Sequence, residues 1–246
     1  MRLYGVAMFE LVDRVLQAQP IPPTSTVTST AVLALFLVWY GRSWRVSRNV
    51  ITIAHEGGHA VVAVLTGRRL QGIRLHSDTS GLTLTRGKLS GPGMVLTLAA
   101  GYTAPSLLGV GGAALLASGR ITLLLWLSIL LIAPMLVMIR NAFGVVSIVV
   151  TGSLLFVVSW YADARWQAAF AYAAVWFLLI GGVRPVLEVQ RQRRRGAARS
   201  SDPDQLADVT PAPGGLWVAI FLLVCAGSLV VGGWLLGLVP AQMQWP

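Results

Sequence analysis

Residues 120–161 read RITLLLWLSILLIAPMLVMIRNAFGVVSIVVTGSLLFVVSWY, two long apolar runs separated only by Arg140 and Asn141. About 20 predominantly apolar residues are enough for a helix to cross the hydrocarbon core of a bilayer. Each half of this stretch is that long, so the sequence predicts two membrane-spanning helices joined by a tight hairpin or a kink. A chain built around such a pair is expected to be a membrane protein and not a soluble globular enzyme.

The composition of the whole chain supports this interpretation. Of its 246 residues, 55% are hydrophobic and 11% are charged, whereas an ordinary soluble domain has about 45–50% and about 25%. The 19 basic and 9 acidic residues give a net charge of +10, and the basic residues fall in short clusters between apolar runs. This pattern is typical of membrane-protein loops rather than of a nucleic-acid-binding groove. We therefore expect the lipid bilayer and no nucleic acid as a partner, with the basic run 184–199 meeting anionic headgroups.

Further apolar runs lie before and after residues 120–161. They predict spans near 25–41, 49–66, 93–118, 120–139, 141–161, 166–183 and 215–238. The expected fold class is an all-α multi-pass membrane protein with about seven transmembrane helices. One transmembrane domain, 25–238, is preceded by an amphipathic surface segment, 1–24, and followed by a short tail, 239–246. Charged residues interrupt the apolar part of 1–24, which argues against a signal peptide.

Two stretches inside the transmembrane domain are not expected to span. Residues 68–90 alternate apolar and polar positions around the turn Ser77-Asp78-Thr79-Ser80-Gly81, which predicts a small membrane-associated β-hairpin. Residues 184–214 are rich in arginine and then in aspartate and proline, which predicts a surface loop ahead of the last helix.

The distribution of lysine and arginine predicts an orientation. Basic residues are concentrated in 1–24, 68–90 and 184–199 and at Arg140, which alternate on one side of a seven-span chain. Cytoplasmic loops carry the excess of basic residues in membrane proteins. We therefore expect a multi-pass protein of the cell membrane with its N-terminus in the cytoplasm and its C-terminus outside, although the basic cluster 42–48 runs against this arrangement.

The second predicted span, 49–66, contains the motif His55-Glu56-Gly57-Gly58-His59. Residues four apart lie on one face of a helix, about one turn from each other. At this spacing two imidazole nitrogens can bind one zinc ion, and Glu56 is placed to take a proton from a zinc-bound water. The single cysteine, Cys225, excludes a cysteine-rich zinc site, so the remaining ligand must be a carboxylate or a third histidine. His76, in the predicted hairpin turn, is expected to be a solvated loop residue.

The third ligand has several candidates. Catalytic zinc sites use three protein ligands and leave one position open for water. The aspartates considered are Asp78, Asp163, Asp202, Asp204 and Asp208. In the expected orientation, Asp202 and Asp204 lie on the membrane face nearer to His59, and Asp202 is the first choice. The competing interpretation of Asp202 is a solvated helix cap, because Ser-Asp-Pro-Asp is typical of a helix start.

A His-Glu-x-x-His motif inside a transmembrane helix, followed by a short hairpin and further spans, resembles the site-2 proteases, intramembrane zinc metallopeptidases of peptidase family M50. The stretch 201–207 (SDPDQLA), ahead of a last span that begins near Trp217, resembles the Ser-Asp-x-x-x-hydrophobic element of the family's B-like branch. One departure is clear: site-2 proteases typically take the third ligand from an Asp-Gly near an Asn-Pro element, and this chain has no Asp-Gly. Asn141 corresponds at most to the asparagine of that element.

The resemblance and the motif together predict a zinc-dependent, membrane-embedded endopeptidase acting on membrane or membrane-proximal proteins. His55, His59 and Asp202 would bind Zn²⁺, Glu56 would be the catalytic base, and an edge of the hairpin would hold an extended substrate by main-chain hydrogen bonds. The alternative is a non-catalytic membrane protein, either a proton-coupled transporter or a metal-binding scaffold. A transporter usually carries further ionisable residues inside other spans, and the predicted spans here have almost none.

Overall fold

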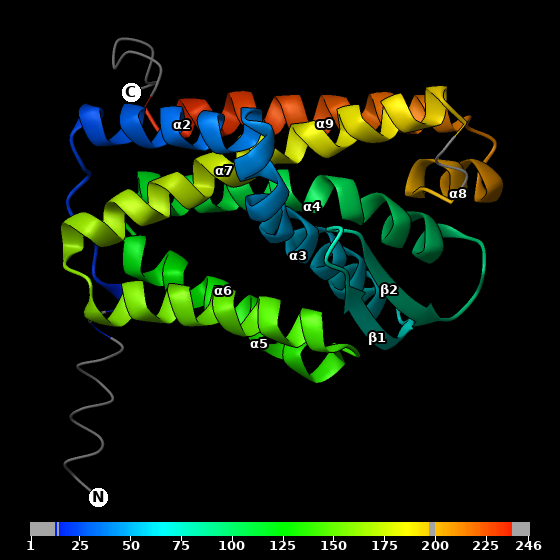
Figure 1. Cartoon of the computed structure of the whole chain (residues 1–246), viewed down its shortest axis with the longest axis horizontal. Coiled ribbons are helices and arrows are strands. Elements are labelled where there is room, and N and C mark those ends of the chain that lie inside the picture. Colours follow the sequence, from blue (N-terminus) through cyan, green and yellow to red (C-terminus); the bar gives the residue numbers. More distant parts are fainter. Residues whose placement is uncertain (1–12, 14, 197–199, 238–246) are drawn as a thin grey trace, which may run out of the picture.

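A computed structural model of the chain describes residues 13, 15–196 and 200–237 (Figure 1). Its elements are α2 (Thr24–Trp39), α3 (Gly41–Leu65), β1 (Arg69–Leu75), β2 (Gly81–Arg86), α4 (Pro92–Ala117), α5 (Ile121–Met138), α6 (Ala142–Tyr161), α7 (Ala164–Arg194), α8 (Asp202–Val209) and α9 (Gly214–Leu235). Most of the expected surface segment 1–24 and all of the tail 239–246 lie outside the described residues.

The predicted multi-pass helical fold is confirmed, but the count of seven spans is not. In the described part of the chain, α4, α5, α6, α7 and α9 are each long and apolar enough to cross a membrane. The helices α2 and α3 meet that test only as a pair bent by 101°, which gives five spans or up to six. The physical reason is length and charge: the 16 residues of α2 extend about 24 Å at 1.5 Å per residue, and the first half of α3 carries Arg42, Arg45 and Arg48.

The predicted loop 184–214 is largely helical. The helix α7 continues to Arg194 instead of ending near residue 183, and α8 lies between it and α9. Arg184 and Glu188 form an ion pair of 2.9 Å at positions i and i+4, a spacing that stabilises a helix. The arginines in the last turn of α7 also suit the negative end of the helix dipole. The change to polar residues after 183 therefore marks the end of the apolar part of α7, whereas the helix itself continues to Arg194.

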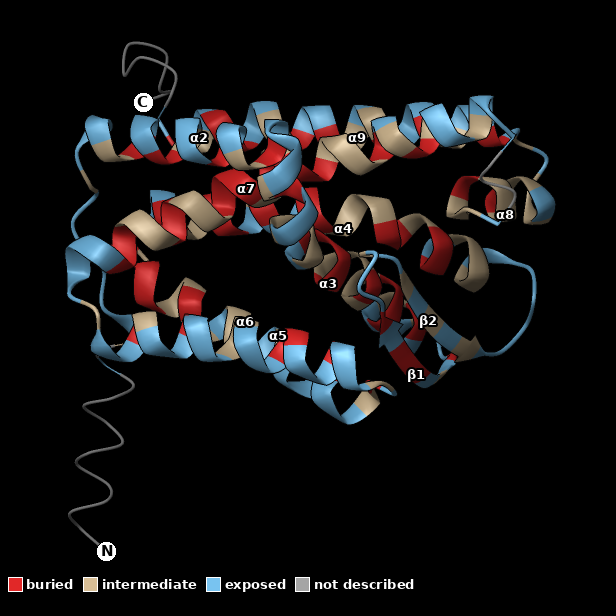
Figure 2. Cartoon of the chain, in the orientation of Figure 1, coloured by how far each residue is buried: buried red, intermediate tan, exposed pale blue. Residues whose placement is uncertain are grey.

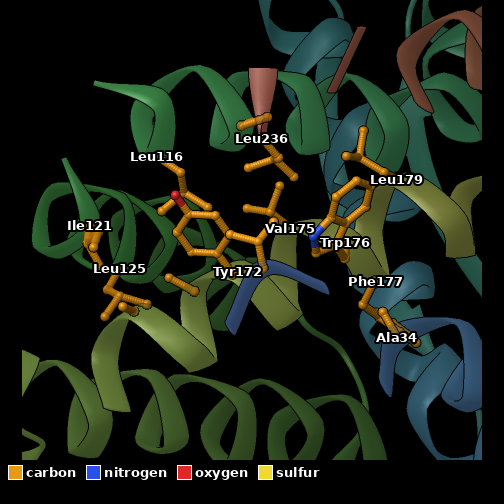
Figure 3. Packing of buried hydrophobic residues seen from close by; sticks show 14 of the residues in the cluster. Ala34, Leu116, Ile121, Leu125, Tyr172, Val175, Trp176, Phe177, Leu179 and Leu236 are labelled. Atoms are coloured by element: carbon orange, nitrogen blue, oxygen red, sulfur yellow. The ribbon is translucent and has the colours of Figure 1, made fainter. Parts of the chain in front are cut away.

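The main core is built around α7, which packs against α2, α4 and α9. Figure 3 shows Tyr172, Val175, Trp176 and Leu179 of α7 among Leu116, Ile121, Leu125 and Leu236. The helices α5 and α6 form the expected hairpin at the edge of the bundle, where a much smaller share of their residues is buried than in α7 (Figure 2). Exposed apolar side chains on α5 and α6 suit a lipid environment.

The predicted β-hairpin is confirmed, and it packs on α3. The antiparallel register pairs Ile73 with Thr83 and Leu75 with Gly81, so these four residues share one face of the sheet. Ile73 and Leu75 are fully buried against α3, α5 and α6. This face of the sheet therefore lies directly against the helix that carries His55-Glu56-Gly57-Gly58-His59.

The link between α5 and α6 covers the free edge of β1. The backbone N–H of Arg140 donates to the carbonyl of Ile73 at 2.9 Å, and Ile139 forms a parallel bridge with Ile73. The side chain of Asn141 donates to the carbonyl of Leu75 at 2.6 Å and accepts from its N–H at 3.2 Å. The break at Arg140-Asn141 thus pairs with the outer edge of β1 through one isolated β-bridge and the Asn141 side chain.

The two ends of the bundle differ in charge. The backbone N–H of Gln19 donates to the carbonyl of Gly119 at 2.8 Å, so residue 19 lies beside the turn between α4 and α5, at the end away from the hairpin (Figure 1). The hairpin end carries most of the described basic residues, Arg68, Arg69, Arg86, Lys88, Arg140, Arg191, Arg193, Arg194 and Arg195, whereas the other end carries Arg120 and Arg165. The expected orientation had placed the N-terminal segment and Arg120 on opposite faces. The structure instead places residue 19 beside Gly119, at the same end as Arg120.

Candidate metal centre

His55, His59 and Asp202 converge at one point between α3, α4 and α8. The Nε2 atoms of the two histidines are 3.1 Å apart, and Oδ2 of Asp202 lies 3.2 Å from Nε2 of His55 and 3.3 Å from Nε2 of His59. In a tetrahedral zinc site with bonds of about 2.0–2.1 Å, ligand atoms are about 3.3 Å apart. Two imidazoles and one carboxylate in this triangle therefore fit three ligands of such a site, with the fourth position left for water.

Two glycines allow the helices to come this close. A Cβ atom at Gly101 of α4 would collide with Nε2 of both His55 and His59, and one at Gly58 of α3 would collide with the side chain of Ala104. Any larger residue at position 101 would fill the space in front of the imidazole nitrogens. A metal ion therefore fits between α3 and α4 only because residue 101 is a glycine.

Neighbouring groups fix the orientation of both imidazoles. Nδ1 of His59 lies 2.7 Å from the carbonyl oxygen of Thr97, so Nδ1–H donates to that carbonyl and Nε2 is the nitrogen directed at Asp202. Such an outer hydrogen bond is the usual support of a metal-binding histidine. The ring of His55 packs edge-on against Tyr102, with 4.8 Å between ring centroids, and Tyr102 stacks on Phe221 of α9.

Asp202 is the first residue of α8, and the helix is docked by other contacts. Arg193 of α7 donates to Asp204 at 2.7 Å, Ser201 donates to Asp204 at 2.6 Å, and Leu206 is fully buried. Burial alone would raise the pKa of Asp202, but the charge of His59 and the hydrogen bonds from both histidines hold this pKa well below its ordinary value. The carboxylate is therefore ionised at neutral pH, which is the form that binds a metal.

The other candidates do not belong to this group. Asp204 is engaged by Arg193 and Ser201, and Asp163 caps α7 by accepting from the N–H of Trp166. Asp78 accepts from Ser80 in the exposed hairpin turn, where His76 also contacts Ser80, and Asp208 is exposed on α8. The interpretation of Asp202 as a solvated cap does not hold, since Ser201 occupies the N-cap position of α8 and Asp202 faces the histidines.

Glu56 is buried beside the group but is not part of it. Its Oε2 accepts a hydrogen bond of 2.6 Å from the hydroxyl of Thr83 on β2. The sequence did not identify Thr83, Thr97 or Gly101, because each acts through a contact between distant elements. The only local signal was the occurrence of a glycine, Gly101, within an apolar span; for Thr83 the alternation was misleading, because Leu82 and Leu84 are exposed and Thr83 faces Glu56.

These features define a class: a multi-pass helical membrane protein with a His-Glu-x-x-His helix and, facing its two histidines at one end of the bundle, an aspartate as the third member of the group. The profile of the Peptidase M50B-like family matches residues 28–232. The chain belongs to this family, which confirms the predicted relationship to the site-2 proteases. No curated protein and no solved structure matches the chain.

Proposed function

We propose that this protein is a zinc-dependent, membrane-embedded endopeptidase. The observation that carries the proposal is the convergence of His55, His59 and Asp202 beside Glu56 in a chain of the Peptidase M50B-like family. Two imidazoles and one carboxylate are a ligand set found in catalytic zinc sites, where the open fourth position is the reactive one.

Zinc, when bound to these three residues, would act as a Lewis acid on the peptide carbonyl and acidify the attacking water. Glu56 would accept a proton from that water while the bond from its oxygen to the carbonyl carbon forms. The same carboxyl group would then return the proton to the amide nitrogen as the C–N bond breaks, leaving a carboxylate on one product and an amine on the other. The Thr97 carbonyl would keep His59 in the required tautomer throughout.

The substrate we propose is an extended peptide segment of a membrane or membrane-proximal protein. A helical backbone has its carbonyls engaged in hydrogen bonds, so a substrate must unwind before hydrolysis. The edge of β1 is already paired with residues 139–141, whereas β2 has no second strand partner within the described residues. Strand addition would therefore use the edge of β2, which passes next to Glu56.

The cellular arrangement we propose follows from the charge of the two ends. Basic residues mark the cytoplasmic side of membrane proteins, so the hairpin end and the candidate metal centre would face the cytoplasm. Residue 19 and the end of α9 would then lie on the opposite face of the cell membrane.

Replacement of Glu56 by glutamine tests the proposal. Glu56→Gln should abolish cleavage of fluorescein-labelled casein by the purified chain in detergent and leave about one zinc per chain, because the residue is a base and not a ligand. His55→Ala and His59→Ala should lose both zinc and cleavage. Metal content by atomic absorption and the rate of fluorescence release provide the two measurements.

The same experiment separates the alternatives. Full cleavage by Glu56→Gln would refute the hydrolytic mechanism. Zinc binding without cleavage by the wild-type chain would favour the metal-binding scaffold, and the absence of zinc would favour the proton-coupled transporter.

A further inference from the structure

Thr83 makes a direct contact with the proposed catalytic base. Its hydroxyl lies 2.6 Å from Oε2 of Glu56 and 3.2 Å from the backbone carbonyl of the same residue. A hydroxyl has one proton to donate, and a hydrogen bond to a carboxylate is stronger than one to a neutral carbonyl. The shorter contact is therefore the principal one, and it joins β2 to the Glu56 side chain.

The backbone of β2 restricts the same carboxylate from a second side. A Cβ atom at Gly81 would collide with Oε1 of Glu56 and would lie 2.5 Å from its Cγ. Gly81 and Thr83 are two residues apart, so they lie on the same face of the strand. The Glu56 side chain is thus confined between the Gly81 backbone and the Thr83 hydroxyl, which leaves it little rotational freedom.

The hairpin does not need the Thr83 bond to stay on α3. Its turn is held by the hydroxyl of Thr52, which donates to the carbonyl of Thr79 at 2.8 Å. Its first strand is held by Asn141, which bonds both backbone groups of Leu75. The burial of Ile73 and Leu75 provides the apolar contact. The contact between Thr83 and Glu56 therefore acts on the orientation of Glu56 rather than on the docking of the sheet.

We propose that Thr83 is the positioning residue for Glu56. The strand β2 would thereby both orient the catalytic base and pair with the extended substrate, so that the two are aligned with each other. The proposal rests on the proposed function, since it assigns Glu56 the role of base. A peptide added to the edge of β2 would meet a carboxylate whose direction the same strand has already fixed. Such preorganisation raises the rate of the chemical step without adding affinity for the substrate.

The kinetic test compares three variants of the zinc-loaded full chain, with fluorescein-labelled casein as the probe. Thr83→Val removes the hydroxyl at nearly constant volume, and Thr83→Ser keeps it. Thr52→Val is the matched control, because it removes a threonine hydroxyl that joins α3 to the hairpin without touching Glu56. We expect kcat of Thr83→Val to fall about tenfold or more with KM within about twofold. The serine variant should recover most of kcat, and Thr52→Val should keep it.

A second readout needs neither metal nor activity. The chain has only three glutamates, Glu10, Glu56 and Glu188. Labelling glutamate with ¹³C at the side-chain carboxyl carbon therefore gives three resonances, and the one that disappears in Glu56→Gln belongs to Glu56. Loss of the donated hydrogen bond in Thr83→Val should shift the Glu56 resonance and leave the other two in place. Thr83→Ser and Thr52→Val should leave all three unchanged.

The outcomes separate this proposal from the proposed function. An unshifted Glu56 resonance in Thr83→Val, or a wild-type kcat with zinc retained, overturns the positioning role. Equal losses in Thr83→Val and Thr52→Val, or loss of zinc from Thr83→Val, also overturn it, because they indicate a structural effect on the hairpin. If Glu56→Gln remains active, the proposed function fails, while the resonance still decides whether Thr83 holds Glu56.

Discussion

At the scale of single residues, Asp202 and not Asp204 is the aspartate that faces the two histidines. Asp202 and Asp204 are two residues apart on α8, and successive residues on a helix are rotated by about 100°, so the two carboxylates point in different directions. Asp202 is directed at His55 and His59, and Asp204 at Arg193. The sequence could rank Asp202 first and Asp204 next among the candidate aspartates, but only the rotation of α8 about its axis distinguishes these two.

A comparison of three aspartates on α8 tests this assignment. Asp202→Ala should cost the most zinc affinity, because a direct ligand is lost. Asp204→Ala should cost about tenfold to 100-fold, the usual effect of an outer-shell partner, because it releases α8 from Arg193. Asp208→Ala should leave zinc affinity unchanged, because Asp208 is exposed. Competition with a chromogenic chelator measures the three affinities, and equal values for the Asp202 and Asp208 variants would exclude Asp202 as a ligand.

At the scale of elements, the sequence predicted those helices and strands whose formation depends on neighbouring residues in the chain. The period-two alternation of 68–90 and the break at Arg140-Asn141 both correspond to observed elements. The continuation of α7 was missed, and α8 was seen only as the helix-start signal Ser-Asp-Pro-Asp inside a predicted loop, because both elements depend on the Arg184–Glu188 pair and on the burial of Leu206 against other helices. The third predicted ligand therefore sits on an element that composition alone assigns to a loop.

The docking of α8 by Arg193 predicts a measurable coupling to metal binding. Arg193→Ala should loosen α8, increase hydrogen exchange in residues 200–209 and lower zinc affinity about tenfold. Arg194→Ala is the matched control, since it removes the same charge one residue away from an exposed position. Excess zinc should restore part of the protection in Arg193→Ala, because ligand binding stabilises the bound conformation. Unchanged exchange in Arg193→Ala would show that α8 is held mainly by Leu206 and its neighbours.

At the scale of the whole molecule, the bend between α2 and α3 determines the path of the chain. A helix that ends inside a bilayer leaves carbonyls without partners, and here Arg184 donates to the carbonyls of Val38 and Trp39. Glu188 balances this charge and also accepts from Arg48 and from Nε1 of Trp44. Counting apolar runs detects α2 and α3 as two spans, because run length contains no information about a bend of 101°. For this reason the sequence placed the N-terminal segment and Arg120 at opposite ends of the bundle, whereas residue 19 lies beside Gly119.

Labelling of single cysteines tests the revised path of the chain. Cys225 is buried and is replaced by alanine, and one cysteine is introduced at Ala18, Lys88, Arg165 or Arg194, which are all exposed. Because basic residues mark the cytoplasmic face, Lys88→Cys and Arg194→Cys should react with a membrane-impermeant maleimide only after lysis, and Arg165→Cys should react in intact cells. Ala18→Cys is the decisive position: the bond between Gln19 and Gly119 places it at the same end as Arg165, so it should also react in intact cells. Reaction of Ala18→Cys only after lysis would mean that α2 and α3 cross the membrane separately.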